Sequence, residues 1–191
     1  MPEAIINAVS RRFALAPAAP VASFPGLTVE RTGPAARFVL RGSEPLAHAA
    51  GAALALELAR KVGRVIEHDG LAALCLGPDE WLLLGPAEQE STLQQRLNAA
   101  LQFLPHSLVS IGNRDVAFVL RGSAAADVIN AGCPLDLRMA GFPAGCCSRT
   151  LLGKAEMILW RSEAQVFRIE TARSLAAYVD QFLLLAARNN L

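Results

Sequence analysis

The sequence predicts an α+β fold built from two related lobes of strands and helices. The first observation is a hexapeptide, Phe-Val-Leu-Arg-Gly-Ser, that occurs letter for letter at residues 38–43 and 118–123. In each copy a β-branched and aromatic run typical of a strand precedes a Gly that ends the strand and a Ser that can cap a helix. The copies are too far apart for a solenoid repeat, so they predict two fused lobes. The second observation is that strand runs joined by short turns are interspersed with a few amphipathic helices, which is typical of α+β proteins.

Residues 1–26 are expected to form an extended or flexible N-terminal arm. Prolines at positions 17, 20 and 25 favour an extended, polyproline-like backbone. One interpretation is a disordered tail; the other is an arm that lies along a partner subunit, because Phe13 and Phe24 are costly to leave in water. Ser10–Phe13 is similar to a twin-arginine export signal, but the stretch after it is weakly apolar and interrupted by two prolines. We therefore expect a cytoplasmic protein.

The first lobe is expected over residues 27–112. Asp69 and Gly70 form a two-residue turn of the hairpin type, and Gly85-Pro86 closes an apolar strand. Farther along, Leu93 and Leu97 begin an apolar pattern with helical spacing. These signals predict strands at residues 27–30, 36–41, 64–68, 71–76, 81–84 and 107–111, and helices at residues 45–58 and from residue 88 to the proline at 105.

The second lobe is expected over residues 113–191 and has a similar order of elements. Gly132 and Pro134 end a short helix, and Leu175, Val179 and Leu183 lie on one face of a longer terminal helix. The patterns predict strands at residues 116–121, 148–152, 156–160 and 165–171, and helices at residues 124–131 and 173–188. The repeated hexapeptide is then the strand-to-helix corner of a duplicated framework. We expect its arginines, Arg41 and Arg121, to cap or pair at the lobe edges.

The composition of the chain excludes several classes of partner. Hydrophobic residues make up 53% of the 191 residues and charged residues 18%, against about 25% charged in typical soluble domains. No uninterrupted apolar run reaches the roughly 18 residues that a membrane span needs. The formal net charge of +1 argues against nucleic acid as a partner. The surplus of apolar residues implies either a large core or a surface that another chain covers.

The sequence contains no recognisable catalytic constellation. His48, His68 and His106 are well separated, and no Ser or Cys beside them forms a nucleophile elbow. Neither a G-x-G-x-x-G motif nor a P-loop is present. The four cysteines lack the paired spacing of metal ligands, and we interpret them as reduced thiols that fill small apolar volumes. We therefore predict no catalytic, cofactor-binding or metal-ligating residue on this chain.

The loop over residues 142–149 is the first candidate for a partner contact. It is apolar and contains glycine, and we expect it to be exposed. Phe142, Cys146 and Arg149 are its candidate contact residues, with plain packing as the alternative.

Three further contact candidates lie outside that loop. Arg114 belongs to a polar turn between two strands, where a local ion pair with Asp115 is the alternative. Phe13 and Phe24 are the aromatic residues of the N-terminal arm.

A series of motifs in order along residues 35–186 resembles the gamma subunit of heterotetrameric sarcosine oxidase. Each motif alone is weak, but their ordered succession is specific. The motifs are LGPDEWLL at 76–83, NRDV at 113–116, GSAA at 122–125, CPLDL at 133–137, RTLLGKAE at 149–156 and LWR at 159–161.

The resemblance implies a fold like the folate-binding, aminomethyltransferase-like domains of the glycine-cleavage T protein. It also implies a complex with alpha, beta and delta subunits, in which this chain is the non-catalytic member and packs mainly against alpha. Such a complex oxidatively demethylates sarcosine to glycine, forms hydrogen peroxide and passes the methyl carbon to tetrahydrofolate. The implied FAD, FMN, NAD and zinc lie on the partner subunits, with no cofactor on this chain.

Three alternatives remain open at the level of sequence. The chain could be the small subunit of the related N-methylglutamate dehydrogenase, which is built from similar subunits. It could be a free-standing folate-binding one-carbon protein, as the T-protein-like fold suggests. It could also be a scaffold for an unrelated partner.

Overall fold

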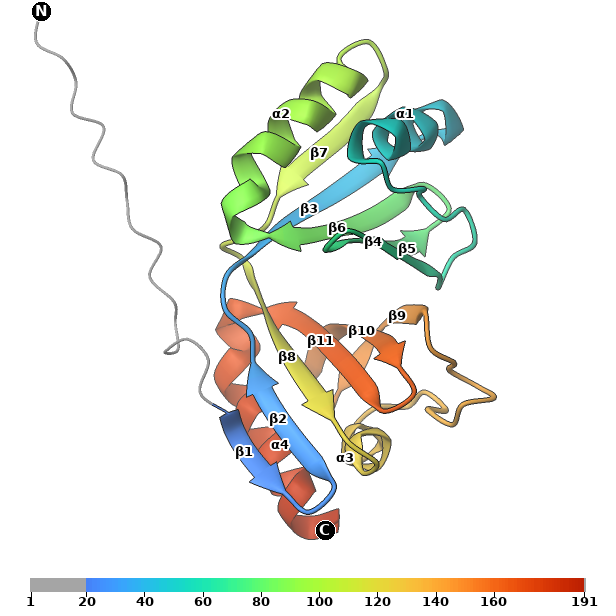
Figure 1. The fold of residues 1–191 in the computed structure, drawn as a ribbon. Helices are drawn as coiled ribbons and strands as arrows, with labels where there is room; N and C mark the ends of the chain where they lie inside the picture. Colours follow the sequence, from blue (N-terminus) through green and yellow to red (C-terminus); the bar gives the residue numbers. More distant parts are fainter. Residues whose placement is uncertain (1–19, 191) are drawn as a thin grey trace, which may run out of the picture.

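Residues 20–190, the part of the chain that the computed structural model describes, form two antiparallel sheets. The sheets face one another, and helices cover the outer face of each, as Figure 1 shows. The layers are therefore helix, sheet, sheet and helix. This architecture confirms the α+β fold predicted from the sequence. The first 19 residues, including Phe13, lie outside the described residues.

The first sheet has five strands in the order β4-β5-β6-β3-β7. Two of its strands, β5 and β6, are apolar along nearly their whole length because both of their faces are covered. One face packs on helices and the other faces the second sheet. The strands are β3 (Ala35–Gly42), β4 (Val65–His68), β5 (Leu71–Gly77), β6 (Glu80–Pro86) and β7 (His106–Ser110).

The second sheet has six strands in the order β1-β2-β8-β11-β10-β9. Three of its strands, β9, β10 and β11, follow one another along the chain and are joined by short turns, as the sequence predicts, and β11 also pairs with β8. The strands are β1 (Pro20–Phe24), β2 (Leu27–Arg31), β8 (Asp115–Arg121), β9 (Cys146–Leu152), β10 (Ala155–Glu163) and β11 (Val166–Ala172).

The start of the chain belongs to the second lobe, which differs from the expected lobe boundaries. β1 occupies residues that the sequence assigned to the arm, and β2 pairs with β8, so that Thr28 lies opposite Arg121. The physical reason is burial: Leu27 and Val29 pack in the core of the second lobe. The chain therefore begins in the second lobe, forms the first lobe, and then returns.

The helices follow the predicted positions with one shorter than expected. α1 ends at Leu54 rather than at residue 58, because Ala55 takes a left-handed conformation (φ 53°) that stops the helix. The four α-helices are α1 (Glu44–Leu54), α2 (Glu90–Leu101), α3 (Ala125–Asn130) and α4 (Ala176–Asn190), and short 3₁₀ turns at Ala87–Gln89 and Arg173–Leu175 precede α2 and α4. Over the described residues, no helix has the length and apolar character needed to cross a membrane.

Three apolar clusters hold these layers together. Phe38, Leu40 and Trp81 face α1 and α2 in the first lobe, and Phe118 and Phe167 lie in the cluster beneath α3 and α4 in the second. A third cluster lies between the sheets and has members from both, which are Val65, Ala72, Leu74, Leu82, Leu84, Ile111, Cys147 and Trp160. The two lobes consequently share apolar contacts and behave as one packed unit.

The repeated hexapeptide forms equivalent corners in β3 and β8, two interior strands of the two sheets. Its serines do not cap as predicted. Ser43 is at the N-cap of α1 without a side-chain capping bond, and Ala124, rather than Ser123, is at the N-cap of α3. Arg41 forms the predicted edge pairs, 3.6 Å from Asp79 and 3.8 Å from Glu80.

The two glycines of the repeat should respond differently to substitution by alanine. Gly122 has φ +124°, and a Cβ there would lie 2.1 Å from the carbonyl oxygen of Gly26. At Gly42 the nearest atom to a Cβ is the flexible Cδ1 of Leu46, at 2.5 Å. We expect Gly122→Ala to lower the free energy of unfolding by roughly 2–4 kcal/mol and Gly42→Ala by only about 1 kcal/mol. Urea denaturation of both variants measures this difference, and equal losses would contradict the structure.

Candidate functional site

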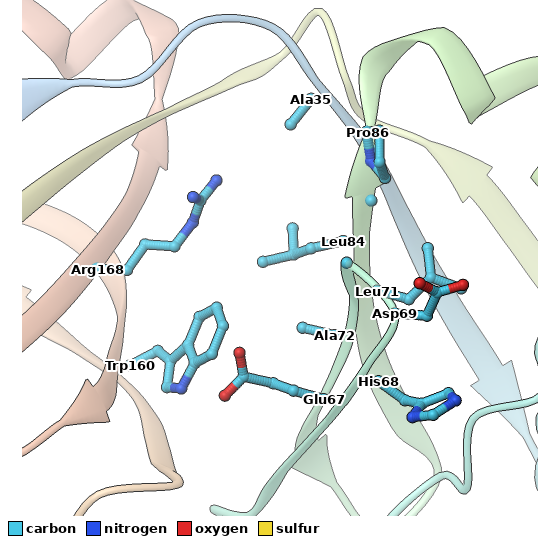
Figure 2. Close-up of a pocket in the computed structure, with 12 residues that line it drawn as sticks. Ala35, Glu67, His68, Asp69, Leu71, Ala72, Leu84, Pro86, Trp160 and Arg168 are labelled. Carbon is cyan, nitrogen blue, oxygen red and sulfur yellow. The ribbon is translucent and has the colours of Figure 1, made fainter.

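A cleft of about 640 Å³ opens between the two sheets. The hairpin between β4 and β5 and the end of β6 form one side of it, and β10 and β11 contribute Trp160 and Arg168 on the other (Figure 2). Apolar side chains, including Leu71 and Leu84, line its inner wall. Clefts of roughly 300–1,000 Å³ with a few polar groups are the usual form of small-molecule sites.

The polar and charged side chains that line this cleft are those of Glu67, His68, Asp69, Trp160 and Arg168. The Nε of Arg168 donates to Oε1 of Glu170 at 2.7 Å, and its guanidinium extends into the cleft in Figure 2. The Nε1 of Trp160 is buried and has no hydrogen-bond partner among the described residues. Burial, with a further contribution from the charge of Glu163, raises the pKa of Glu67 above its ordinary value.

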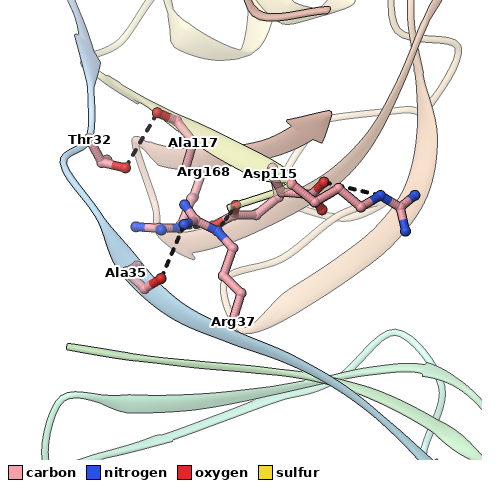
Figure 3. Close-up of polar contacts among 8 residues, drawn as sticks. Thr32, Ala35, Arg37, Asp115, Ala117 and Arg168 are labelled. Carbon is pink, nitrogen blue, oxygen red and sulfur yellow. Dashed lines mark hydrogen bonds and ion pairs between the residues drawn. The ribbon is translucent and has the colours of Figure 1, made fainter. Parts of the chain in front are cut away.

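A buried ion pair joins the two sheets behind the cleft. Nε of Arg37, on β3, donates to Oε2 of Glu170, on β11, at 2.7 Å, and the two side chains are 2% and 1% exposed. The second oxygen of the same carboxylate accepts the bond from Arg168. Figure 3 shows Arg37 reaching from the first sheet toward this cluster. Two guanidinium groups therefore share one carboxylate.

The buried and charged surroundings of the Arg37–Glu170 pair make either residue costly to replace. Asp115 lies near it, and burial raises the pKa of Asp115 although Arg114, 3.6 Å away, opposes the shift. Nη2 of Arg37 is buried without a partner among the described residues. Removing one member of such a buried pair typically costs about 3–5 kcal/mol, because the other charge is left without compensation. Glu170 is thus the single anchor between the lobes in this polar cluster.

Backbone bonds join the sheets along a second line. The N–H of Val65 donates to the carbonyl of Gly145 at 2.9 Å, and the N–H of Cys147 donates to the carbonyl of Gly63 at 2.9 Å. The ion pair of Arg149 with Glu80 crosses the same seam. The seam ties the start of β9 to the region before β4.

The loop containing Phe142 is placed differently from the sequence expectation. Phe142 is 7% exposed and belongs to the core of the second lobe, so the prediction that it is exposed is wrong. The guanidinium of Arg161 explains its position, because Nη1 donates to the carbonyls of Leu137 and Phe142, each at 2.9 Å. These two hydrogen bonds hold the loop against the second lobe, with the ring of Phe142 in its core.

The other contact candidates remain at or near the surface. Cys146 is half-buried and Nη1 of Arg64 lies 3.8 Å from its Sγ. Arg149 is engaged with Glu80, and Arg114 forms the local pair that the sequence offered as its alternative. Phe24 is half-buried against the core of the second lobe.

The groups that meet at the cleft were not identified from the sequence. Arg37 and Glu170 lie in apolar strands, and a charged residue inside such a strand is the signal that could have marked them. His48, His68 and His106 are all exposed. Among residues 20–190, no three His, Cys, Asp or Glu side chains converge as a metal-binding group.

Comparison with known proteins finds one matching family model and several relatives that are similar in sequence. Residues 41–189 match the SoxG family, described as sarcosine oxidase, gamma subunit family. The chain is 32% identical over 143 residues to sarcosine oxidase subunit gamma of Corynebacterium sp. (strain U-96), a match that covers 75% of this chain and 67% of that protein.

Solved structures give the same result in three dimensions. A chain of the heterotetrameric sarcosine oxidase from Corynebacterium sp. U-96, in complex with pyrrole 2-carboxylate, matches with a TM-score of 0.82 and 28% identity over 89% of this chain and 88% of that one. The glycine cleavage system aminomethyltransferase T from Bartonella henselae matches with a TM-score of 0.57 and 17% identity, over 81% of this chain and 46% of that one. The second match shows a shared fold alone.

Placing a charge at Phe142 should damage the fold of this chain itself. We expect Phe142→Asp to lower the free energy of unfolding by roughly 3 kcal/mol or more, because a carboxylate would enter an apolar core. The matched control is Ala144→Asp, in the same loop at an exposed position, with an expected change within about 0.5 kcal/mol. Urea denaturation measures both, and a Phe142→Asp variant as stable as the control would contradict the burial of this ring.

Proposed function

The chain belongs to the sarcosine oxidase gamma subunit family, and from this membership we propose that it is the non-catalytic, structural gamma subunit of a heterotetrameric sarcosine oxidase. The family predicted from the sequence motifs is confirmed, and so is the fold shared with the glycine-cleavage T protein. The observation that carries the proposal is the TM-score of 0.82 with a chain of such an enzyme over most of both chains.

The proposed partners are the alpha, beta and delta subunits, with alpha as the main contact. The assembled enzyme would oxidatively demethylate sarcosine to glycine, form hydrogen peroxide and pass the methyl carbon to tetrahydrofolate. We place FAD, FMN, NAD and zinc on the other three subunits.

Exposed apolar side chains on the first lobe support a contact with another subunit. Phe103, in the turn after α2, is 88% exposed, and Val109 on β7 is 50% exposed. β7 is an edge strand of its sheet, so its outer backbone groups are available to a neighbouring chain. We propose that this edge contacts the alpha subunit. Cys146 and Arg149, and Phe24 at the other end of the molecule, remain proposed contacts, whereas Phe142 is excluded by its burial.

A pair of charge variants at the end of α2 tests this function and its contact surface. The full-length chain, carrying an affinity tag, is co-expressed with the alpha, beta and delta subunits, and the captured complex is quantified. We expect all three partners and flavin with the wild-type chain, and no flavin with this chain expressed alone. Phe103→Asp should reduce capture about tenfold or more if this ring is a contact hot spot. Gln102→Asp adds the same charge at an adjacent exposed residue and should capture normally.

Different failures of this experiment have different meanings. A wild-type chain that captures none of the three partners would contradict the proposed function. Normal capture by Phe103→Asp would leave the function standing and move the contact surface elsewhere. A chain that stays alone and binds tetrahydrofolate in calorimetry would instead fit a free-standing folate-binding protein.

A further inference from the structure

We propose that the cleft between the two sheets binds a small zwitterion whose carboxylate and ammonium groups are separated by an apolar chain, such as an ω-amino acid. All of the residues that carry this inference belong to this one chain. The site therefore goes beyond the structural role proposed above. It is defined by a positive group at one end, acidic groups at the other end, and an apolar wall between them.

The positive end is the guanidinium of Arg168. Its Nε is bound to Glu170, and its terminal nitrogens have no hydrogen bond to any described residue. Arg37 takes the other oxygen of the same carboxylate, and the neighbouring Asp115 is paired with Arg114. Two guanidinium groups share one carboxylate, so this end of the cleft carries an uncompensated positive charge. A ligand carboxylate at the terminal nitrogens would balance it in a charge-assisted bond.

The acidic end is the hairpin between β4 and β5. Glu67 and Asp69 both line the cleft there, and Figure 2 shows the carboxylate of Glu67 directed toward the indole of Trp160. Burial and the nearby charge of Glu163 raise the pKa of Glu67. The charged form of this carboxylate therefore lacks, among the described residues, a neighbouring cation that would stabilise it. An ammonium group of a ligand would supply that cation and lower the pKa again.

The apolar wall lies between these ends. The ring of Trp160 and the side chains of Leu71 and Leu84 form it, and in Figure 2 the indole lies between Arg168 and Glu67. Only 7% of the surface of Trp160 is exposed, yet its indole N–H has no acceptor among the described residues. A buried donor without an acceptor is rare and calls for an explanation such as an absent ligand. A ligand in the cleft would cover the ring of Trp160.

The indole N–H signals of the two tryptophans provide a direct test. In the ¹⁵N-labelled full-length chain we would titrate 6-aminohexanoate, hexanoate and hexylamine, which share one apolar chain and differ in the charged groups at its ends. We expect a saturable shift of the Trp160 signal with 6-aminohexanoate, and about tenfold weaker binding of the two compounds that lack one charge. The Trp81 signal should not move, because its Nε1 donates to the carbonyl of Ala59 at 2.7 Å.

Glutamine variants of two exposed glutamates complete the test. Glu67→Gln removes the charge at the acidic end and should weaken the binding of 6-aminohexanoate about tenfold, to the level of hexanoate. Glu57→Gln, in the exposed loop after α1, should bind as the wild type does. Equal binding of hexanoate and 6-aminohexanoate would overturn the zwitterion assignment. No shift of Trp160 with any of the three compounds would overturn the site itself, while assembly with the partner subunits would be unaffected.

Discussion

The buried pair of Arg37 and Glu170 is the contact on which the placement of the two sheets depends. It joins β3 to β11 at 2.7 Å, with both side chains almost completely removed from water. Burying two charges has a large desolvation cost, which the short bonds and the second guanidinium of Arg168 offset. Apolar residues of similar size could pack as well, so the value of the pair lies in fixing one orientation of the lobes. The cleft lies beside this pair, because Arg168, which lines the cleft, bonds to the same carboxylate.

Local patterns predicted most of the elements, because strand alternation, glycine turns and helical spacing act over a few residues. They failed where the outcome depends on distant parts of the chain. The hairpin of β1 and β2 joins the second sheet because Leu27 and Val29 fit its core, and nothing near them in sequence states this. Phe142 is drawn inward by Arg161, which lies 19 residues away. Glu67 and Arg168 both line the cleft but come from strands that are distant in the sequence. Local patterns therefore gave no indication that they lie around one cleft.

The exposed apolar surface of the first lobe and the cleft between the two sheets would have different roles in this chain. The apolar clusters of the two lobes make a rigid body from a chain that is 53% hydrophobic, and the exposed Phe103 and Val109 leave part of that apolar content on the surface. This surface would serve assembly, whereas the cleft contains Trp160, whose buried indole N–H has no hydrogen-bond partner among the described residues. The chain shares its fold with the glycine cleavage T protein. A shared fold does not require that this chain perform the same chemistry.

The most direct measurement is a cryo-electron microscopy structure of the complex purified from the native host through a tag on this chain. It should contain this chain as one of four different subunits, with the flavins, NAD and zinc contacted by the other three. The edge strand β7 should be covered by the alpha subunit. A flavin or zinc ion held by side chains of this chain would contradict its non-catalytic role, and a particle without the other three subunits would contradict the assignment altogether.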